Sequence, residues 1–220
     1  MIFLNELSGY NILICFGTRP EYIKLKYFID NLENIKTCFT GQHPDLLNNV
    51  IVDYKLNINN NSCENRLNNI TTSILKYTSI FKNIDYVMIQ GDTSSALSIA
   101  LSAFHNKKKI IHLEAGLRTY KKTPYPEEMN RQLISKLTDI HLCYYDFHKK
   151  NLIKENIKNN IHIIGNPYLK QFNKNINYLD IVIITLHRNE NIDIIDKWFR
   201  EMESISLKFK DLKFFFIKNK

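Results

Sequence analysis

The hydrophobic and polar residues of this chain alternate in a pattern typical of α/β proteins. Short runs rich in β-branched and aromatic residues are followed by longer segments in which apolar residues recur every three or four positions. Strands are expected at 11–16, 36–39, 86–90, 109–113, 140–144, 161–164 and 181–185, with a further apolar run at 214–217. Strands and helices that alternate in this way form parallel sheets covered by helices.

The helical period is clearest at 20–32, where Leu25, Phe28 and Leu32 follow a three-to-four spacing. Further helices are expected at 44–53, 64–82, 94–105, 127–138, 146–156 and 193–208.

The polar segment 169–180 lacks a clear period and precedes a fresh apolar strand, so we predict a linker there. This prediction gives a complete α/β domain over 1–168 and a partial second domain over 181–220. The second part holds only one strand–helix–strand unit, which is too small to form an independent sheet. We therefore expect its apolar strands, 181–184 and 214–216, to be poorly covered.

The composition adds few restrictions. A chain of 220 residues with 44% hydrophobic residues can bury a substantial core. No run of about 18 apolar residues occurs, and Asn5 and Glu6 interrupt the opening segment where a signal peptide requires apolar residues. We therefore expect a cytoplasmic protein without membrane contact.

Charge and cysteine content point away from nucleic acids and metals. The formal net charge is +8, but the lysines are dispersed among asparagines and isoleucines, so no nucleic-acid surface is expected. The cysteines at positions 15, 38, 63 and 143 show no spacing that suits a metal or a disulfide framework, and we expect them to be reduced.

Chemically active residues gather directly after the predicted strands. In a parallel α/β sheet the carboxyl ends of the strands lie at one edge, and ligands bind there. The segments are GTRPE (17–21), TGQH (40–43), GDTSS (91–95), EAGLR (114–118), GNP (165–167) and LHRNE (186–190). Turn formation or helix capping explains any one of them equally well. Their concentration at one edge favours a binding site.

The segment CFGTRPEYIK (15–24) predicts an anion site. Pro20 suits a first helical turn, and Gly17 and Thr18 are expected to turn their backbone N–H groups outward. Arg19 offers a fork of donors for phosphate oxygens. Lys24, one turn further, can reach back over the same site because helical side chains tilt toward the N-terminus. The structural alternative is a pair of solvated cations.

Carboxylates dominate the other strand ends. Asp92, Glu114, Glu127 and Glu128, with His187, suit the removal and return of a proton at a carbon next to a negatively charged leaving group. One of the paired glutamates is expected only to favour the helix start. Neither GxGxxG after the first strand nor a GxxxxGK[ST] loop occurs, so nicotinamide and ATP cofactors are not expected. The remaining histidines are taken as ordinary strand or surface residues: His105, His112, His141, His148 and His162.

These turns, in this order, resemble those of the non-hydrolysing UDP-N-acetylglucosamine 2-epimerase family. The similar segments are FGTRPEYIK (16–24), TGQHPDLL (40–47), QGDTSSAL (90–97), HLEAGLRT (112–119), PEEMNRQL (126–133), IGN (164–166) and HRNEN (187–191). The resemblance implies Rossmann-like domains in the GT-B arrangement, with the sugar nucleotide between them and no metal or cofactor. It makes 181–220 part of a UDP-binding domain.

The resemblance also implies a reaction and a set of residues. The reaction is an isomerisation of UDP-GlcNAc to UDP-ManNAc, by elimination and re-addition of UDP through a bound 2-acetamidoglucal, for polysaccharide biosynthesis. The implied catalytic residues are Lys24, Asp92, Glu114, Glu127 and His187. The implied substrate contacts are Arg19, Thr93, Arg118, Arg131 and Arg188, with Gln42 and His43 as effector or substrate contacts. Which carboxylate acts as base on each face of the sugar stays open.

Two features depart from the family pattern. Leu186 and Asn189 replace the glycine and the second arginine that accompany the family's histidine. The family's Ser-Gly-Gly turn and the two glutamates after it, which belong to its second domain, are absent from this sequence. Three hypotheses therefore stay open. The chain is an active epimerase, as a homodimer or completed by a C-terminal polypeptide; it is a truncated, inactive homologue; or it acts on another UDP-2-acetamido sugar.

Overall fold

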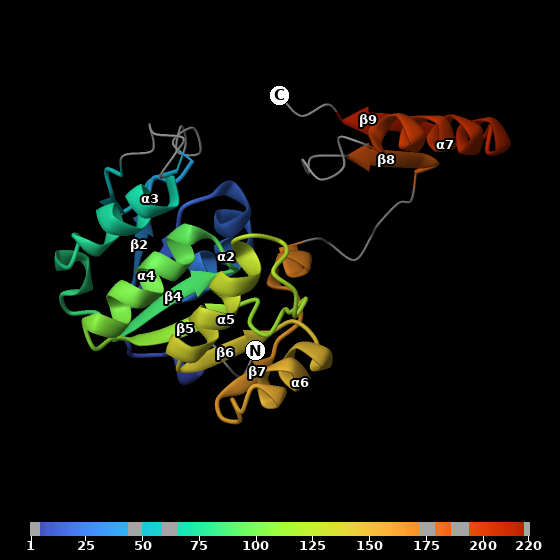
Figure 1. Ribbon diagram of the computed structural model, residues 1–220. Helices are drawn as coiled ribbons and strands as arrows, with labels where there is room; N and C mark the ends of the chain where they lie inside the picture. Colours follow the sequence, from blue (N-terminus) through green and yellow to red (C-terminus); the bar gives the residue numbers. More distant parts are fainter. Residues whose placement is uncertain (1–4, 44–49, 59–65, 172–178, 186–193, 218–220) are drawn as a thin grey trace. The chain divides into compact units, whose positions relative to one another are not determined.

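A computed structural model describes residues 5–43, 50–58, 66–171, 179–185 and 194–217 (Figure 1). The chain divides into two compact units, Met1–Phe172 and Asn173–Lys220. The first contains a seven-stranded sheet and the second a two-stranded sheet.

Strands and helices alternate along the first unit. The strands are β1 (Ile12–Phe16), β2 (Ile35–Phe39), β3 (Tyr54–Lys55), β4 (Tyr86–Gln90), β5 (Lys109–Leu113), β6 (Ile140–Cys143) and β7 (Ile161–Ile163). The helices are α2 (Arg19–Asn31), α3 (Arg66–Leu75), α4 (Ser94–His105), α5 (Glu127–Leu137) and α6 (Asp146–Lys154), with 3-10 turns η2 (Ser79–Phe81) and η3 (Pro167–Gln171). The strands predicted from apolar runs are confirmed to within about two residues at each end.

The large sheet is parallel throughout, in the order β3-β2-β1-β4-β5-β6-β7. The chain first builds outward from β1 to β3, and then from β4 to β7 on the other side. Ligands of open parallel sheets bind where this order reverses, outside the carboxyl ends of the strands. Here that point lies between β1 and β4, so the turns 17–21 and 91–95 flank it.

The central strand β1 shows why the strands appear in the sequence as continuous apolar runs. All five of its residues are buried. Ile12, Ile14 and Phe16 pack in one cluster with Leu25 and Phe28 of α2. The alternate residues of the strand pack in a second cluster with residues of α3 and α4. A strand buried on both faces must be apolar throughout, whereas a half-exposed strand alternates.

Two predicted helices differ from the structure. The predicted helix 64–82 ends at Leu75, and residues 79–81 form a separate 3-10 turn. In the predicted helix 44–53, residues 44–49 lie outside the described residues, and 50–53 are not helical. They lead instead into β3, a strand of two residues that pairs with the end of β2 and is too short to leave a period in the sequence.

The second unit consists of β8 (Ile181–Thr185), α7 (Ile195–Lys208) and β9 (Lys213–Ile217), with the two strands parallel. The predicted single strand–helix–strand unit is confirmed. None of the residues of α7 is buried. Of the predicted linker, 169–171 belong to η3, which packs against α2, and 172–178 lie outside the described residues. Among the described helices, none combines the length and apolar character needed to cross a membrane.

Candidate active site

Lys24 of α2 and Glu114, which directly follows β5, form an ion pair. The Nζ–Oε2 distance is 2.5 Å, and the side chains are 31% and 18% exposed. Gln90, the last residue of β4, is buried and donates from Nε2 to the same Oε2. A cation and an amide therefore fix one carboxylate oxygen at a partly accessible position on the sheet edge.

The backbone of Glu114 adopts a conformation that is unusual for a residue with a side chain. Its φ angle is +70°, in the left-handed region. Its N–H donates to the carbonyl of Leu142 at 3.0 Å, at the end of the neighbouring strand β6. Left-handed conformations cost a non-glycine residue about 1–2 kcal/mol, and such residues cluster at functional sites. The packed edge of the sheet thus holds Glu114 in a strained backbone conformation.

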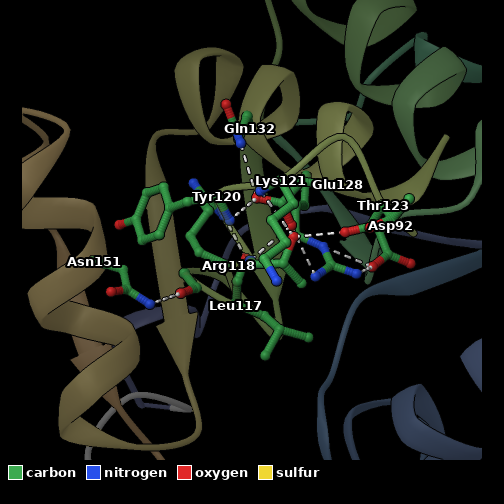
Figure 2. A network of polar contacts seen from close by, with 12 residues as sticks. Asp92, Leu117, Arg118, Tyr120, Lys121, Thr123, Glu128, Gln132 and Asn151 are labelled. Atoms are coloured by element: carbon green, nitrogen blue, oxygen red, sulfur yellow. Dashed lines mark hydrogen bonds and ion pairs between the residues drawn. The ribbon is translucent and has the colours of Figure 1, made fainter. Parts of the chain in front are cut away.

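Asp92 is fixed by α5 through both its side chain and its main chain. The Nε of Arg131 donates to Oδ2 at 2.9 Å, and Nη2 makes a second contact with the same oxygen (Figure 2). Asn130 donates from Nδ2 to the carbonyl of Asp92 at 2.8 Å. The predicted substrate contact Arg131 is almost wholly buried, so it positions Asp92 rather than offering an accessible guanidinium.

The two adjacent glutamates at the start of α5 lie in different surroundings. Glu128 is fully buried and accepts hydrogen bonds from the backbone N–H groups of Thr119, at 3.0 Å, and Tyr120, at 3.1 Å (Figure 2). Burial raises the pKa of Glu128, but these bonds and one from Gln132 together bring the pKa below its ordinary value. Glu127 is partly exposed at the N-terminus of the helix. Glu128 is therefore the structural member of the pair.

The turn after β1 is organised by an internal carboxylate. Glu21 is buried, and its Oε2 accepts the N–H groups of Gly17 and Thr18, each at 2.7 Å. Its Oε1 accepts the hydroxyl of Thr93 at 2.6 Å. Burial raises the pKa of Glu21, against the opposing effect of these hydrogen bonds. The prediction that the amides of Gly17 and Thr18 face outward to bind an anion is wrong, because a glutamate of their own helix already occupies them.

The predicted cations of this turn remain at the edge. Arg19 is exposed at the first residue of α2, and Lys24 lies one turn further along the same helix. Both side chains are reachable by solvent, whereas the turn amides are bound to Glu21. Thr93, a predicted substrate contact, caps α4 by accepting the N–H of Ala96 at 3.1 Å and is also the partner of Glu21.

The turns after β1, β2 and β4 interlock around Gly17. Thr40 donates to Ser95 at 2.9 Å between hydroxyl oxygens, and the N–H of Ser95 donates to Oε1 of Gln42 at 3.2 Å. The N–H of His43 donates to the carbonyl of Gly17 at 3.0 Å. A Cβ atom on Gly17 would lie 2.6 Å from Oγ of Ser95 and also collide with Thr40. Gly17 is thus required by close packing, and the predicted contacts Gln42 and His43 belong to this interlock.

Arg118 is not accessible to solvent at the sheet edge. Its side chain has 0% exposure, and its Nε and Nη2 donate to the two carboxylate oxygens of Glu155, at 2.6 and 2.9 Å. Further bonds join it to the hydroxyl of Ser135 and the carbonyl of Leu117, each at 2.8 Å. Arg118 therefore ties the turn after β5 to α5 and to the end of α6. His187 and Arg188 lie outside the described residues.

Sequence reasoning missed the roles of Gln90, Glu21 and His112. His112 is fully buried in β5, its Nε2 lies 2.7 Å from the carbonyl oxygen of Gly91, and burial lowers its pKa to about 3. A neutral imidazole here donates to the residue before Asp92 and so supports that turn. Gln90 and His112 lie within or beside the segments QGDTSS and HLEAGLR, and this adjacency is the signal that could have identified them.

Within the described residues, His, Cys, Asp and Glu form no group of three that could hold a metal ion.

Comparison with known proteins identifies the family of this chain. The family model described as UDP-N-acetylglucosamine 2-epimerase matches residues 30–220. The chain belongs to this epimerase family. The UDP-N-acetylglucosamine 2-epimerase of Campylobacter jejuni is 41% identical over 175 residues, a match that covers 72% of this chain and 45% of the relative.

Solved epimerase structures have the same fold. The Neisseria meningitidis UDP-GlcNAc 2-epimerase bound to UDP-GlcNAc matches with a TM-score of 0.78 and 29% identity, over 94% of this chain and 65% of that one. The S. aureus MnaA–UDP structure matches with a TM-score of 0.81 and 27% identity, over 96% and 62%. The predicted Rossmann-like fold of the GT-B type, with an incomplete second domain, is confirmed.

The chain corresponds to only part of each curated relative. It spans between 45% and 60% of the length of the curated relatives it matches. The predicted catalytic residues Lys24, Asp92 and Glu114 lie at the carboxyl edge of the sheet of the first unit, and Glu127 lies at the start of α5.

Proposed function

We propose that this chain supplies the proton-transfer side of a UDP-N-acetylglucosamine 2-epimerase. The observation that carries the proposal is the ion pair of Lys24 and Glu114, 2.5 Å apart beside the point where the strand order reverses. It places a cation and a base together at the edge where parallel sheets bind ligands. The relatives whose structures contain UDP-GlcNAc or UDP support a UDP-sugar as the ligand.

The proposed reaction eliminates UDP across C1 and C2 of the sugar. A carboxylate takes the C2 proton, the C–H electron pair forms the C1=C2 double bond, and the C1–O bond breaks as UDP leaves with its pair. Re-addition of UDP to the bound 2-acetamidoglucal, with protonation of C2 on the opposite face, gives the epimer. Asp92, Glu114 and Glu127 are the proposed proton-transfer groups.

Cations at the same edge stabilise the negative charge that develops on the departing diphosphate. Lys24 and Arg19 are the proposed contacts, and both are reachable by solvent. A charge held in place before the reaction stabilises the transition state without reorganisation at the moment of bond cleavage. By the family pattern, His187 and Arg188 are proposed to act from the second domain.

The proposed setting is the cytoplasm. Cys15, Cys38 and Cys143 are free, buried thiols, which supports a reducing compartment. The proposed partner is a C-terminal polypeptide that completes the UDP-binding domain, because the matched relatives are about twice as long as the part this chain represents.

The test is proton exchange at C2. The chain is incubated with UDP-GlcNAc in D2O, alone and with the C-terminal part of the Neisseria meningitidis enzyme that this chain does not match, and deuterium at C2 is followed by NMR. We expect exchange in the combined sample and a loss of exchange with Glu127→Gln. Absence of exchange in both samples would contradict the proposal and favour an inactive homologue.

A further inference from the structure

Gln90 is a polar residue at the end of an otherwise apolar strand. All five residues of β4 are buried, and the four before Gln90 are aromatic or apolar. Gln90 itself is only 3% exposed. Glutamine is seldom buried so fully, because an amide that is removed from water raises the free energy of the fold unless it is hydrogen-bonded. The role of this residue therefore depends on its partner.

The partner of Gln90 is the carboxylate of Glu114. Nε2 of Gln90 donates to Oε2 of Glu114, the same oxygen that lies 2.5 Å from Nζ of Lys24. An apolar side chain of similar volume would fill the buried end of β4 equally well, so packing alone does not require an amide there. The carboxylate does require it, because the amide is one of its two donors.

The main chain of Glu114 is fixed on both sides. The carbonyl of Leu113 accepts the N–H of Gly91 at 3.0 Å, and the N–H of Glu114 donates to the carbonyl of Leu142 at 3.0 Å. Gln90 lies opposite Leu113 in the register of β4 and β5. The end of β4 therefore anchors the chain just before Glu114 through Gly91 and its side chain through Gln90.

The two donors leave one carboxylate oxygen for chemistry. A carboxylate oxygen accepts about two hydrogen bonds, and Lys24 and Gln90 both donate to Oε2. Among the described residues, no donor contacts Oε1 of Glu114. The side chain is 18% exposed, so a ligand at the sheet edge can reach it. The geometry thus divides the carboxylate into a held oxygen and an available one.

We propose that Gln90 is a positioning residue, which holds Oε2 of Glu114 so that Oε1 is left to take the C2 proton of the sugar. The C2–H bond breaks, its electron pair forms the C1=C2 double bond, and the C1–O bond breaks with its pair on the departing UDP. The proton moves to Oε1. Gln90 acts through Glu114 and not on the substrate. This inference rests on the proposed function, because it names the reacting atom of that site.

The first test is Gln90→Met, which keeps the length of the side chain and removes the donor. We expect kcat for C2 exchange to fall about tenfold or more and KM to change by no more than about twofold, because the position of a base affects the chemical step and not the binding of the nucleotide. Exchange is followed by NMR in D2O, in the sample in which the unaltered chain shows it. Urea unfolding of the variant checks that it folds.

Gln132→Met is the matched control. Gln132 of α5 donates to Glu128 at 2.8 Å, so the same change removes the same kind of bond from a glutamate that takes no part in the proposed proton transfer. The control is expected to keep kcat within about twofold of the unaltered chain.

Gln90→Glu separates positioning from packing. An ionised glutamate at position 90 repels Glu114, whereas a protonated one donates to it as the amide does, and two adjacent carboxyl groups readily share one proton. We expect the ratio of kcat in this variant to kcat in the unaltered chain to rise about fivefold or more between about pH 8 and about pH 6. The same ratio for Gln90→Met should stay flat.

The neighbouring charged groups do not produce this rise. Lys24 contacts the same carboxylate in all of these variants, and Arg131 holds Asp92 in an ion pair. Burial and the charge of Glu114 raise the pKa of Tyr144, which follows β6, and burial lowers the pKa of His112 in β5 to about 3. Tyr144 and His112 therefore stay neutral over the whole range.

A further measurement reports on the hydrogen bond without any activity. The NMR resonance of one Nε2 proton of Gln90 is expected downfield of the ordinary side-chain amide range, because its acceptor is a carboxylate. It should return to that range in Glu114→Ala.

Four results would each overturn the inference and leave the proposed function standing. They are an ordinary Nε2 resonance, an unchanged kcat in Gln90→Met, equal losses in Gln90→Met and Gln132→Met, and a flat ratio for Gln90→Glu. Where Gln90→Met does not fold, the ratio for Gln90→Glu decides. Absence of exchange by the unaltered chain in every sample overturns the proposed function and this inference together.

Discussion

The ammonium of Lys24 lies 2.5 Å from the carboxylate of Glu114, although 90 residues separate them in the chain. The second turn of α2 supplies the lysine, and the residue after β5 supplies the glutamate. The pair bridges the two halves of the sheet, which build outward from β1 and from β4. The proposed proton-transfer group and the proposed diphosphate contact are thereby brought together by the order of the strands.

Removing the lysine should impair chemistry more than folding. In the completed enzyme, Lys24→Met is expected to slow C2 exchange by about 100-fold, the usual effect of removing one charge-stabilising group. The unfolding free energy should fall by about 1 kcal/mol or less, because partly exposed ion pairs contribute little. NMR in D2O measures the first quantity and urea unfolding the second.

Lys26→Met is the matched control for that variant. Lys26 lies on the same helix and pairs with Asp30 at 2.8 Å on the exposed side. The Lys26→Met variant is expected to leave C2 exchange unchanged. Equal losses of exchange in the two variants would mean that Lys24 acts through helix stability and not at the substrate.

Substitutions of the two adjacent glutamates of α5 should have different effects, one on stability and the other on C2 exchange. Glu128→Ala removes a buried carboxylate that holds Thr119, Tyr120 and Arg131, and should lower the unfolding free energy by about 3 kcal/mol. Glu127→Ala should change it by no more than about 0.5 kcal/mol, because Glu127 is partly exposed, yet should abolish C2 exchange. Denaturant unfolding and the exchange assay, run on both variants, check this. A reversed order of the two stabilities would refute the assignment of Glu128 as the structural residue.

Stability should fall in mild acid because of His112. The unfolded chain binds a proton at this residue near pH 6.5, whereas burial lowers the folded pKa to about 3. Between these values the unfolded state holds more protons, so the unfolding free energy should fall by about 1.4 kcal/mol per pH unit from this one group. The stability that the neutral His112 allows is fully present above pH 6.5 and is lost as the pH falls below that value.

Two variants isolate that contribution. His112→Gln removes the titrating group and should flatten the dependence between pH 6.5 and 5, measured by urea unfolding. His105→Gln is the control, since His105 is exposed, and should leave the slope unchanged. His141, whose pKa is also lowered by burial, adds to the slope in both backgrounds. An identical slope in wild type and His112→Gln would exclude His112 as the source.

The interlock around Gly17 gives a stability prediction. Gly17→Ala forces a Cβ atom to within 2.6 Å of Oγ and 2.9 Å of Cβ of Ser95, and against Thr40. Overpacking of this kind costs about 1–3 kcal/mol. In a Thr40→Ala/Ser95→Gly background, which lacks the colliding atoms, the same change should cost less. Urea unfolding of the four proteins measures the coupling, and equal costs in both backgrounds would contradict the packing explanation.

The fold could be predicted from the sequence because a strand that is buried on both faces of the sheet appears in the sequence as a continuous apolar run. β1 and β4 are buried at every position, and both were located to within about a residue. β3 was missed, since two residues leave no period. The predicted helix 64–82 was too long because periodicity does not show where a helix ends, and the 3-10 turn at 79–81 continues the apolar spacing.

The candidate site was predicted at the level of segments but not of partners. The turn sequences placed Lys24, Asp92 and Glu114 at one edge. They did not show that Glu21 would take the amides of Gly17 and Thr18, or that Arg118 would be enclosed by Glu155. Such pairings depend on which turns the sheet order brings together, and residue type alone does not determine whether an arginine faces solvent or another element.

The left-handed backbone of Glu114 has a consequence for the stability of this chain. Glycine at this position would release about 1–2 kcal/mol of backbone strain, and asparagine tolerates the conformation better than glutamate does. Glutamate at this position therefore lowers the stability of the folded backbone while it supplies the carboxylate that pairs with Lys24.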